Sequence, residues 1–199
     1  MIPQRHDMSR IGLLGGSFNP AHEGHREISL KAIRLFGLDA VWWLVTPGNP
    51  LKAHEDYKYD SYEVRLAAAR QVANHPRIVV SNFEARRGLQ YTVDTLEALR
   101  ELWPQMTFIW LMGADSLAGF HKWKDWRAIA GGVPIAVFNR PGFEKAALAS
   151  ETAKELALFR IPSGRAAELA DAEPPAWAFI EETANPASAS EIRKARSGR

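Results

Sequence analysis

The sequence predicts an α/β fold with a doubly wound, mostly parallel sheet. Two observations predict it. Short apolar runs of strand length alternate along the chain with segments whose apolar residues recur at helical spacing. Clusters of Gly, Pro, Asn and charged residues directly follow several of the apolar runs. In a parallel sheet these clusters would gather at one edge, the carboxyl ends of the strands, where such folds bind ligands.

The first expected strand is Arg10 to Leu14, an apolar run closed by a tight turn at Gly15-Gly16. A helix is expected from His22 to Phe36, because its apolar residues repeat every three or four positions. The run AVWWLVTPG, residues 40–48, is the second expected strand.

Asp60 precedes the next expected helix, with Glu63 three residues later as a capping-box partner and an end near Ala73. RIVVSNF, residues 77–83, is the third expected strand. Thr92 is then expected to begin, as N-cap, an amphipathic helix that closes near Pro104.

The second half of the chain continues the alternation. The expected elements are a strand at 107–113, a helix at 121–132, a strand at 133–142, a helix at 144–156, a short strand at 158–162, a surface excursion at 163–176 and a last strand at 176–182. A short tail helix is expected to begin at Ser188, with Glu191 completing a capping box.

Length and composition limit the possible domain organisation and function classes. The 199 residues suit one domain, which we place at 10–199 after a polar leader, residues 1–9, that could be disordered. The 25 basic side chains nearly balance the 23 acidic ones, which disfavours a nucleic-acid surface. Cysteine is absent, which excludes disulfides and thiolate metal sites, and apolar runs are too short to span a membrane. The polar first residues lack the apolar stretch of a secretory signal, so we expect a cytoplasmic location.

The stretch GGSFNPAHEGH, residues 15–25, carries the clearest chemistry. A Gly-Gly turn after a strand lets the backbone approach a phosphate and point N–H groups at it. His22 and His25 would lie on one face at the start of a helix, where two imidazoles suit an oligophosphate. Either histidine alone would more often be a solvated or capping residue, but the pair within this loop favours a function.

This stretch resembles the GG[ST]FDPxHxGH signature of the HxGH nucleotidylyltransferases, and SASEIR near the chain's end is similar to their ISSTxIR signature. Between them, QYTVDTL, LMGADSL, FHKWKDW and VFNRPGF resemble segments of the nicotinate mononucleotide adenylyltransferases. The resemblance covers residues 10–195 and implies a Rossmann-like fold of the nucleotidylyltransferase type. Asn19 stands where the signature has Asp, and Leu51 where relatives have His.

The resemblance implies transfer of AMP from ATP to nicotinate mononucleotide, giving nicotinate adenine dinucleotide and pyrophosphate in NAD biosynthesis. The attacking phosphate is already an anion, so alignment and charge neutralisation matter more than a general base. His22, His25 and Arg193 are the implied catalytic residues. Mg²⁺ is expected to arrive with ATP, because no His, Asp and Glu pattern has the spacing of a protein-held transition metal.

The resemblance also implies two sets of binding residues. Those for ATP are Gly15, Gly16, Ser17, Phe18, Gly113, Asp115, Ser188 and Ser190. Those for nicotinate mononucleotide are Asn49, Lys52, Tyr91, Thr92 and Trp123. N–H groups near Thr92 would bind the nicotinate carboxylate, and Trp123 would stack on the pyridine ring.

Purely structural roles remain alternatives at several of these positions. Lys52 could be a solvated loop lysine, Asp115 a helix cap, and Arg140 a partner of a surface acid rather than a neighbour of the adenine. At the level of function, transfer to phosphopantetheine and a non-catalytic nucleotide-binding protein remain alternatives. The expected partners are ATP and nicotinate mononucleotide, not nucleic acid or membrane, and the expected assembly is a monomer or homodimer.

Overall fold

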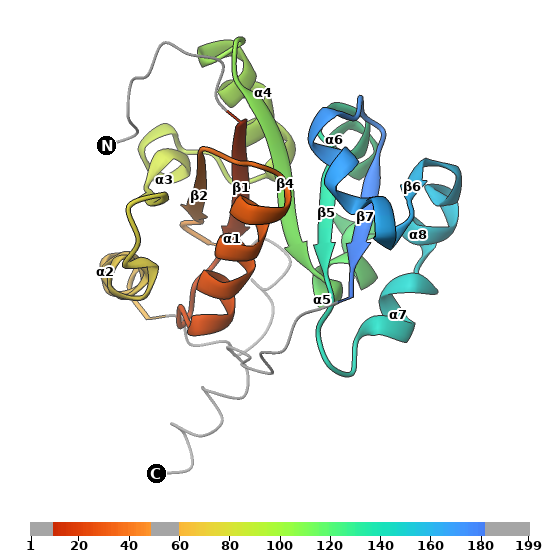
Figure 1. The fold of residues 1–199 in the computed structure, drawn as a ribbon. Helices are drawn as coiled ribbons and strands as arrows, with labels where there is room; N and C mark the ends of the chain where they lie inside the picture. Colours follow the sequence, from red (N-terminus) through yellow and green to blue (C-terminus); the bar gives the residue numbers. More distant parts are fainter. Residues whose placement is uncertain (1–9, 49–59, 182–199) are drawn as a thin grey trace.

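A seven-stranded sheet forms the centre of the computed structural model, which describes residues 10–48 and 60–181. Its strand order is β3-β2-β1-β4-β5-β7-β6, and every neighbouring pair is parallel (Figure 1). The strands are β1 (Arg10–Gly16), β2 (Ala40–Val45), β3 (Ile78–Ser81), β4 (Thr107–Gly113), β5 (Ile135–Phe138), β6 (Arg160–Ile161) and β7 (Trp177–Ile180).

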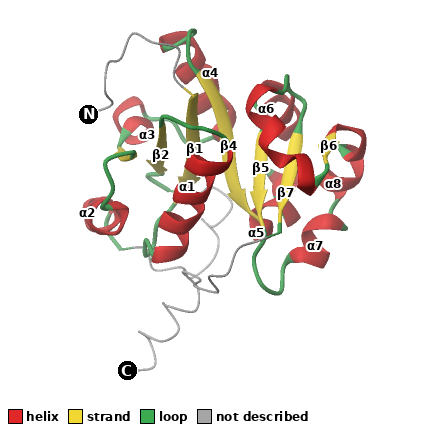
Figure 2. Ribbon diagram, in the orientation of Figure 1, coloured by secondary structure: helices red, strands yellow, loops and turns green. Residues whose placement is uncertain are grey.

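Helices cover both faces of this sheet (Figure 2). On one face lie α1 (Glu23–Leu35), α2 (Tyr62–Ala73) and the 3-10 segment η4 (Ser163–Asp171). On the other lie α3 (Phe83–Arg87), α4 (Thr92–Leu102), α5 (Ala114–Ala118), η2 (Phe120–Lys122), α6 (Trp126–Gly132), α7 (Glu144–Leu148) and α8 (Glu151–Glu155). A further 3-10 turn, η3 (Ala157–Phe159), leads into β6. The expected doubly wound α/β fold is confirmed.

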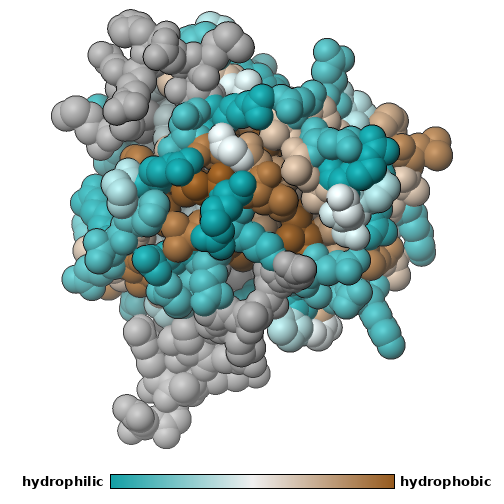
Figure 3. All heavy atoms as spheres, viewed as in Figure 1, coloured by the Kyte–Doolittle hydropathy of each residue, from teal (hydrophilic) through white to brown (hydrophobic). Residues whose placement is uncertain are grey.

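Burial on both faces explains why the strands are nearly continuous apolar runs. Successive residues of a strand enter opposite cores: Leu13 and Trp42 pack on one side, Leu14 and Trp43 on the other. All four are at most 5% exposed. In Figure 3 hydrophobic side chains show at the centre of one face, surrounded by hydrophilic ones.

The direction in which the chain adds strands to the sheet reverses between β1 and β4. From β1 the chain winds outward through β2 to β3, then returns to β4 and winds outward the other way. The β1–β2 crossover covers one face of the sheet and the β4–β5 crossover the other. In parallel α/β folds this arrangement places the ligand crevice at the carboxyl ends of the two central strands, here β1 and β4. Gly16 ends β1, Gly113 ends β4, and Thr46 follows β2, so these expected clusters do share one edge.

Several local expectations were wrong. The N-cap of α2 is Ser61, whose Oγ accepts from the Val64 N–H, so Asp60 and Glu63 form no capping box there. The N-cap of α4 is Tyr91, and Thr92 is the first helical residue.

The expected helix at 144–156 is divided into α7 and α8, because the Ser150 hydroxyl accepts from the Ala153 N–H and starts a new helix. The expected helix at 121–132 is likewise divided into η2 and α6. The segment 163–176 is more than a surface excursion, since η4 buries Ala166, Leu169 and Ala170. Among the described residues, no helix combines the length and apolar character needed to cross a bilayer.

Candidate active site

The loop after β1 is built around Phe18. Its φ of +47° lies in the left-handed region, which is uncommon for a residue with a side chain and marks a tightly constrained turn. The Phe18 ring is 2% exposed and stacks on Trp43, with centroids 4.9 Å apart. The side chain therefore supports the loop from beneath, and only the Phe18 backbone is available to a phosphate.

His25 rests on the same support. Its ring centroid lies 4.8 Å from that of Phe18 and 3.9 Å from that of His22. The carbonyl of His25 accepts from the Ser29 hydroxyl, and Ser29 Oγ in turn accepts from Trp43 Nε1, both at 2.8 Å. The first turn of α1 is thus tied to β2, and the expected placement of the two histidines on one face is confirmed.

A backbone contact fixes the orientation of the His25 ring. The His22 N–H lies 3.2 Å from Nδ1 of His25 and donates to it when His25 carries its proton on Nε2. The His22 carbonyl already accepts from the His25 N–H at 3.0 Å. This tautomer gives both backbone groups a partner and leaves Nε2–H of a neutral His25 as a donor.

The surroundings of both histidines lower their pKa values, which favours uncharged rings at neutral pH. Burial and, second, the Arg140 guanidinium lower the pKa of His22 to about 4, while Asp115 opposes them. Burial and then His22 lower the pKa of His25 to about 3. Each cause penalises a second positive charge in this pocket, so an imidazolium would require an anion beside it.

Asp115 and Arg140 form an ion pair next to the histidines. Arg140 Nη1 lies 2.7 Å from Asp115 Oδ2, and both side chains are partly buried. Asp115 lies in the first turn of α5, whose N-cap is Gly113, so it is not the helix cap. The acid that pairs with Arg140 is therefore a residue of the expected ATP site.

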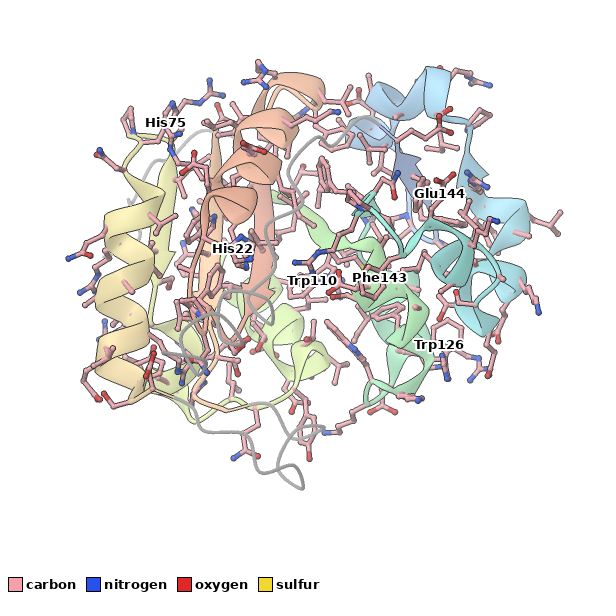
Figure 4. The ribbon with its side chains drawn as sticks, turned by 90° about the horizontal axis from the view of Figure 1, so that it is seen from below. His22, His75, Trp110, Trp126, Phe143 and Glu144 are labelled. Atoms are coloured by element: carbon pink, nitrogen blue, oxygen red, sulfur yellow. The ribbon has the colours of Figure 1, made fainter. Side chains whose placement is uncertain are left out.

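Trp110 of β4 lies beneath the loop. A Cβ on Gly15 would approach Cη2 of Trp110 to 2.5 Å, so packing by itself requires glycine at position 15. The Trp110 ring also meets the Trp123 ring at 87°, with centroids 6.2 Å apart. Figure 4 looks onto this edge of the sheet, with His22 and Trp110 near the middle of the view.

The start of α4 lies against the segment that carries Trp123 and Lys124. Lys124 Nζ lies 4.6 Å from the centroid of the Tyr91 ring and 3.3 Å from Asp94 Oδ1. These contacts bring the first turn of α4, which includes Thr92, next to the segment that carries Trp123. Three residues expected to bind nicotinate mononucleotide are therefore neighbours.

Sequence reasoning missed Arg65. This arginine of α2 is 2% exposed and donates to four backbone carbonyls: Ser17 at 2.6 Å, Thr46 and Pro47 at 2.9 Å, and Asp60 at 3.2 Å. It joins the loop after β1 to the loop after β2. The sequence offered only a weak signal, an arginine on the apolar face of an amphipathic helix.

Five expected site residues lie outside the described residues, namely Asn49, Lys52, Ser188, Ser190 and Arg193. Within the described part, His, Asp and Glu side chains form no group of three or more that could hold a metal ion.

Comparison with known proteins identifies the relatives of this chain. A family model described as cytidylyltransferase-like matches residues 13–195. The chain is 50% identical over 184 residues to the probable nicotinate-nucleotide adenylyltransferase of Ruegeria sp. (strain TM1040), covering 92% of this chain and 96% of that protein. It is also 50% identical over 171 residues to the protein of the same name from Bradyrhizobium sp. (strain BTAi1 / ATCC BAA-1182), covering 86% and 88%.

Solved structures share the fold. The Plasmodium falciparum nicotinic acid mononucleotide adenylyltransferase complexed with NaAD superposes with a TM-score of 0.70 at 19% identity, covering 94% of this chain and 83% of that one. The same protein complexed with APC gives a TM-score of 0.68 at 18% identity. At this level of identity the likeness concerns the fold.

Proposed function

This chain belongs to the cytidylyltransferase-like family and, within it, to the nicotinate-nucleotide adenylyltransferases, and from this premise we propose how its residues transfer AMP from ATP to nicotinate mononucleotide. The products are nicotinate adenine dinucleotide and pyrophosphate, and the reaction belongs to NAD biosynthesis. One observation carries the proposal: His22 and His25 lie together at the start of α1, with ring centroids 3.9 Å apart, beside the crevice at the β1–β4 switch point.

The reaction is an in-line displacement at the α-phosphorus of ATP. An oxygen of the nicotinate mononucleotide phosphate forms the new P–O bond, and the bond from the α-phosphorus to the bridging oxygen breaks and releases pyrophosphate. The attacking oxygen carries its own negative charge, so no side chain has to remove a proton. The protein has to align two anions that repel each other and to stabilise the charge at the transferred phosphoryl group.

Donors at the β1–α1 junction meet this requirement. We assign the α- and β-phosphates of ATP to the backbone N–H groups of Gly16 to Phe18, the N-terminus of α1 and the two imidazoles. His25 donates through Nε2–H in the neutral tautomer and in the protonated ring alike. The polyanion opposes the lowering of both histidine pKa values, so protonation accompanies substrate binding rather than preceding it.

Arg140 and Asp115 are assigned to the adenosine side, where their ion pair gives that wall a fixed shape. On the leaving-group side we assign Arg193, Ser188 and Ser190. A guanidinium can grip pyrophosphate with two parallel hydrogen bonds, and the two hydroxyls can add donors.

The start of α4 is assigned to the acceptor. The helix has 11 residues, and N–H groups of its first turn, around Thr92, can bind the nicotinate carboxylate. Lys124 supplies positive charge to the same wall, and Trp123 an aromatic surface for the pyridine ring. Asn49 and Lys52 are assigned to the acceptor's phosphate. A neutral nicotinamide would gain less from this field, which favours nicotinate mononucleotide.

Magnesium is proposed to enter with ATP as the charge-neutralising partner of its phosphates. Asp115, the carboxylate beside His22, is already engaged by Arg140, which fits a metal held chiefly by substrate oxygens and water. The proposed location is the cytoplasm, and the proposed assembly is a monomer or homodimer.

The decisive test is pyrophosphate release with ATP, Mg²⁺ and one acceptor at a time. Release with nicotinate mononucleotide and much less with nicotinamide mononucleotide is expected. Equal release with the two would refute the assignment of the carboxylate to α4. Release with phosphopantetheine alone, or with none of the acceptors, would refute the proposed reaction.

A further inference from the structure

Ser29 and Trp43 form a hydrogen bond beneath the first turn of α1, and the mechanism above gives neither residue a role. Trp43 Nε1 donates to Ser29 Oγ at 2.8 Å, and both residues are fully buried. Ser29 Oγ donates in turn to the carbonyl of His25, also at 2.8 Å. A hydroxyl has one proton and two lone pairs, so both bonds form at the same time. One hydroxyl group therefore links the backbone of His25 to the side chain of a residue of β2.

The periods of strand and helix bring these residues together. Trp43 follows Trp42 in β2, so its side chain enters the opposite core, which α1 covers. Ser29 lies four residues after His25 in α1 and so on the same face of the helix. A serine inside a helix often bonds back to the carbonyl four residues earlier, which does not stabilise the helix. Here the same hydroxyl also accepts from an indole N–H, which needs an acceptor when it is buried.

The bond also fixes how the Trp43 ring lies beneath the site. An indole has its donor on one edge only, so the bond to Ser29 excludes the flipped orientation of the ring. The Trp43 ring stacks on Phe18 at 16°, with centroids 4.9 Å apart, and its centroid lies 5.8 Å from that of His25. Phe18 itself lies against His25, with centroids 4.8 Å apart. His25 is thus connected to Trp43 twice, through its backbone carbonyl and through its ring.

We propose that Ser29 and Trp43 are positioning residues for His25, and that their hydrogen bond sets the place from which its imidazole meets the phosphates of ATP. The inference rests on the proposed function and adds to it two residues that do not touch substrate. A catalytic side chain has to lie within roughly 0.5 Å of its productive position. Loss of the bond should therefore slow the transfer step more than it weakens binding of nicotinate mononucleotide, which is assigned to other elements.

The test measures pyrophosphate release by Ser29→Ala in the full-length protein. We expect kcat to fall roughly 10-fold, between the loss of one hydrogen bond and a displacement of the ring by about 1 Å. The KM for nicotinate mononucleotide should stay close to that of wild type. Trp43→Phe removes the donor and should lower kcat by a similar factor. The double variant should be no slower than the slower single variant, because the two residues act as a pair.

A His25→Ala background separates positioning from a general effect on the fold. In that background the imidazole is already absent, so adding Ser29→Ala should change kcat by less than roughly 2-fold. An equal reduction of kcat in both backgrounds would show that Ser29 acts on the fold alone, and would overturn the proposal. So would an unchanged kcat in Ser29→Ala, or a raised KM for nicotinate mononucleotide without any change in kcat.

Trp42→Phe and Ser150→Ala are the matched controls. Trp42 is also buried but contacts the rings of Trp103 and Phe108 in the other core. Ser150 is a buried serine that caps α8. Both changes should lower the midpoint of urea unfolding and leave kcat near that of wild type. A loss of kcat in these controls equal to that in Ser29→Ala would overturn the proposal as well.

Ser29→Cys provides a milder change at the same position. A thiol is a weaker donor and acceptor than a hydroxyl, so this variant should lose less kcat than Ser29→Ala. Circular dichroism at the assay temperature shows whether each variant is folded, and Ser29→Cys takes the place of Ser29→Ala if the alanine variant is not. A Ser29→Cys protein that is slower than a folded Ser29→Ala protein would contradict a role for the hydrogen bond.

A second readout needs no substrate. The imidazole ¹⁵N shifts of His25 distinguish a ring with its proton on Nε2 from one with its proton on Nδ1. The wild-type ring, whose Nδ1 lies 3.2 Å from the His22 N–H, should show the Nε2–H form. Ser29→Ala should move both shifts toward a mixture of the two forms, and shifts identical to those of wild type would overturn the proposal. If no acceptor supports turnover, the proposed function fails, and these spectra alone decide whether Ser29 positions His25.

Discussion

His25 owes its position to contacts that exist before any substrate binds. The Phe18 and Trp43 rings lie against it, and the His22 N–H reaches its Nδ1. A side chain held in this way does not have to be ordered when ATP binds. The contact at Nδ1 already fixes the direction of its Nε2–H donor. Such preorganisation makes an electrostatic contact effective at the transition state.

Removal of either imidazole should therefore reduce turnover strongly. We expect His22→Ala and His25→Ala each to lower kcat for pyrophosphate release by roughly 100-fold or more, as for other lost transition-state donors. His75→Asn is the control, because His75 lies on another part of the molecule, where its Nδ1 accepts from the Arg77 N–H (Figure 4). Near-normal kcat in both alanine variants would contradict the assigned role.

Gly15 shows a residue whose identity is set by packing as well as by chemistry. We expect Gly15→Ala to destabilise the protein by about 1–3 kcal/mol, because the added methyl group overlaps Trp110. Shortening the ring in Gly15→Ala/Trp110→Phe should recover part of this loss, as a favourable coupling in a double-mutant cycle of urea unfolding.

Gly131→Ala provides the comparison for Gly15→Ala. Nothing lies within 4 Å of a Cβ at Gly131, a helical position of α6, so this change should be neutral or slightly stabilising. Full additivity of the Gly15 and Trp110 changes would show that their contact does not set the cost.

Among the secondary-structure elements, α2 has a role that its sequence pattern does not predict: it holds two loops together. It packs against the sheet through Leu66 and Ala69, as an amphipathic helix should, but its Arg65 also reaches the loops after β1 and β2. The loop that we assign to ATP and the loop that we assign to the acceptor are therefore held by one guanidinium. Its planar fork is suited to several carbonyls at once, and a lysine is not.

Arg65→Lys tests this task. The change should lower the free energy of unfolding by about 2–4 kcal/mol, since charged hydrogen bonds contribute about 1.5–3 kcal/mol each and lysine can replace only some of them. The KM for both substrates should rise together, because both loops depend on the same guanidinium. Arg70→Lys, an exposed position on the same helix, should stay within about 0.5 kcal/mol of wild type. A stable Arg65→Lys protein with unchanged KM values would contradict a positioning role.

At the scale of the whole molecule, the switch point between β1 and β4 brings together loops that are far apart in sequence. The histidines come from the first 25 residues, Asp115 from α5 and Arg140 from the loop after β5. The wall that we assign to the acceptor comes from the start of α4 and the segment that carries Trp123 and Lys124. A dinucleotide that spans the crevice would contact all of these parts at once and should stabilise the fold as a unit.

Thermal unfolding with the product measures that effect. Nicotinate adenine dinucleotide at 100 times its Kd should stabilise the protein by about 2.7 kcal/mol. For a chain of this size the corresponding rise in Tm is roughly 5–10 °C. NAD, with an amide in place of the carboxylate, should give a smaller rise at the same concentration. Equal rises would contradict carboxylate recognition, and no rise with either would contradict a dinucleotide site here.

Three features could be predicted from the sequence: the α/β class, the approximate extent of most strands and of α1, and the pairing of His22 with His25. These features are local. Strand and helix periodicity follow from backbone geometry, and two residues three apart on a helix are neighbours whatever surrounds them. Family motifs added the expected site residues, although five of those lie outside the described residues.

The contacts between residues far apart in the chain could not be predicted, because they depend on how the strands are ordered in the sheet. Arg65 with Ser17 and Pro47, Glu84 with Thr95, and Asp115 with Arg140 are contacts across 11 to 48 positions of the chain. The tertiary structure also decided the lowered pKa values of the two histidines, because desolvation depends on what packs around a ring. Neither the long-range contacts nor the desolvation of a ring produces a repeating pattern in the local sequence. Strand order fixes both, by bringing particular loop ends to the same edge of the sheet.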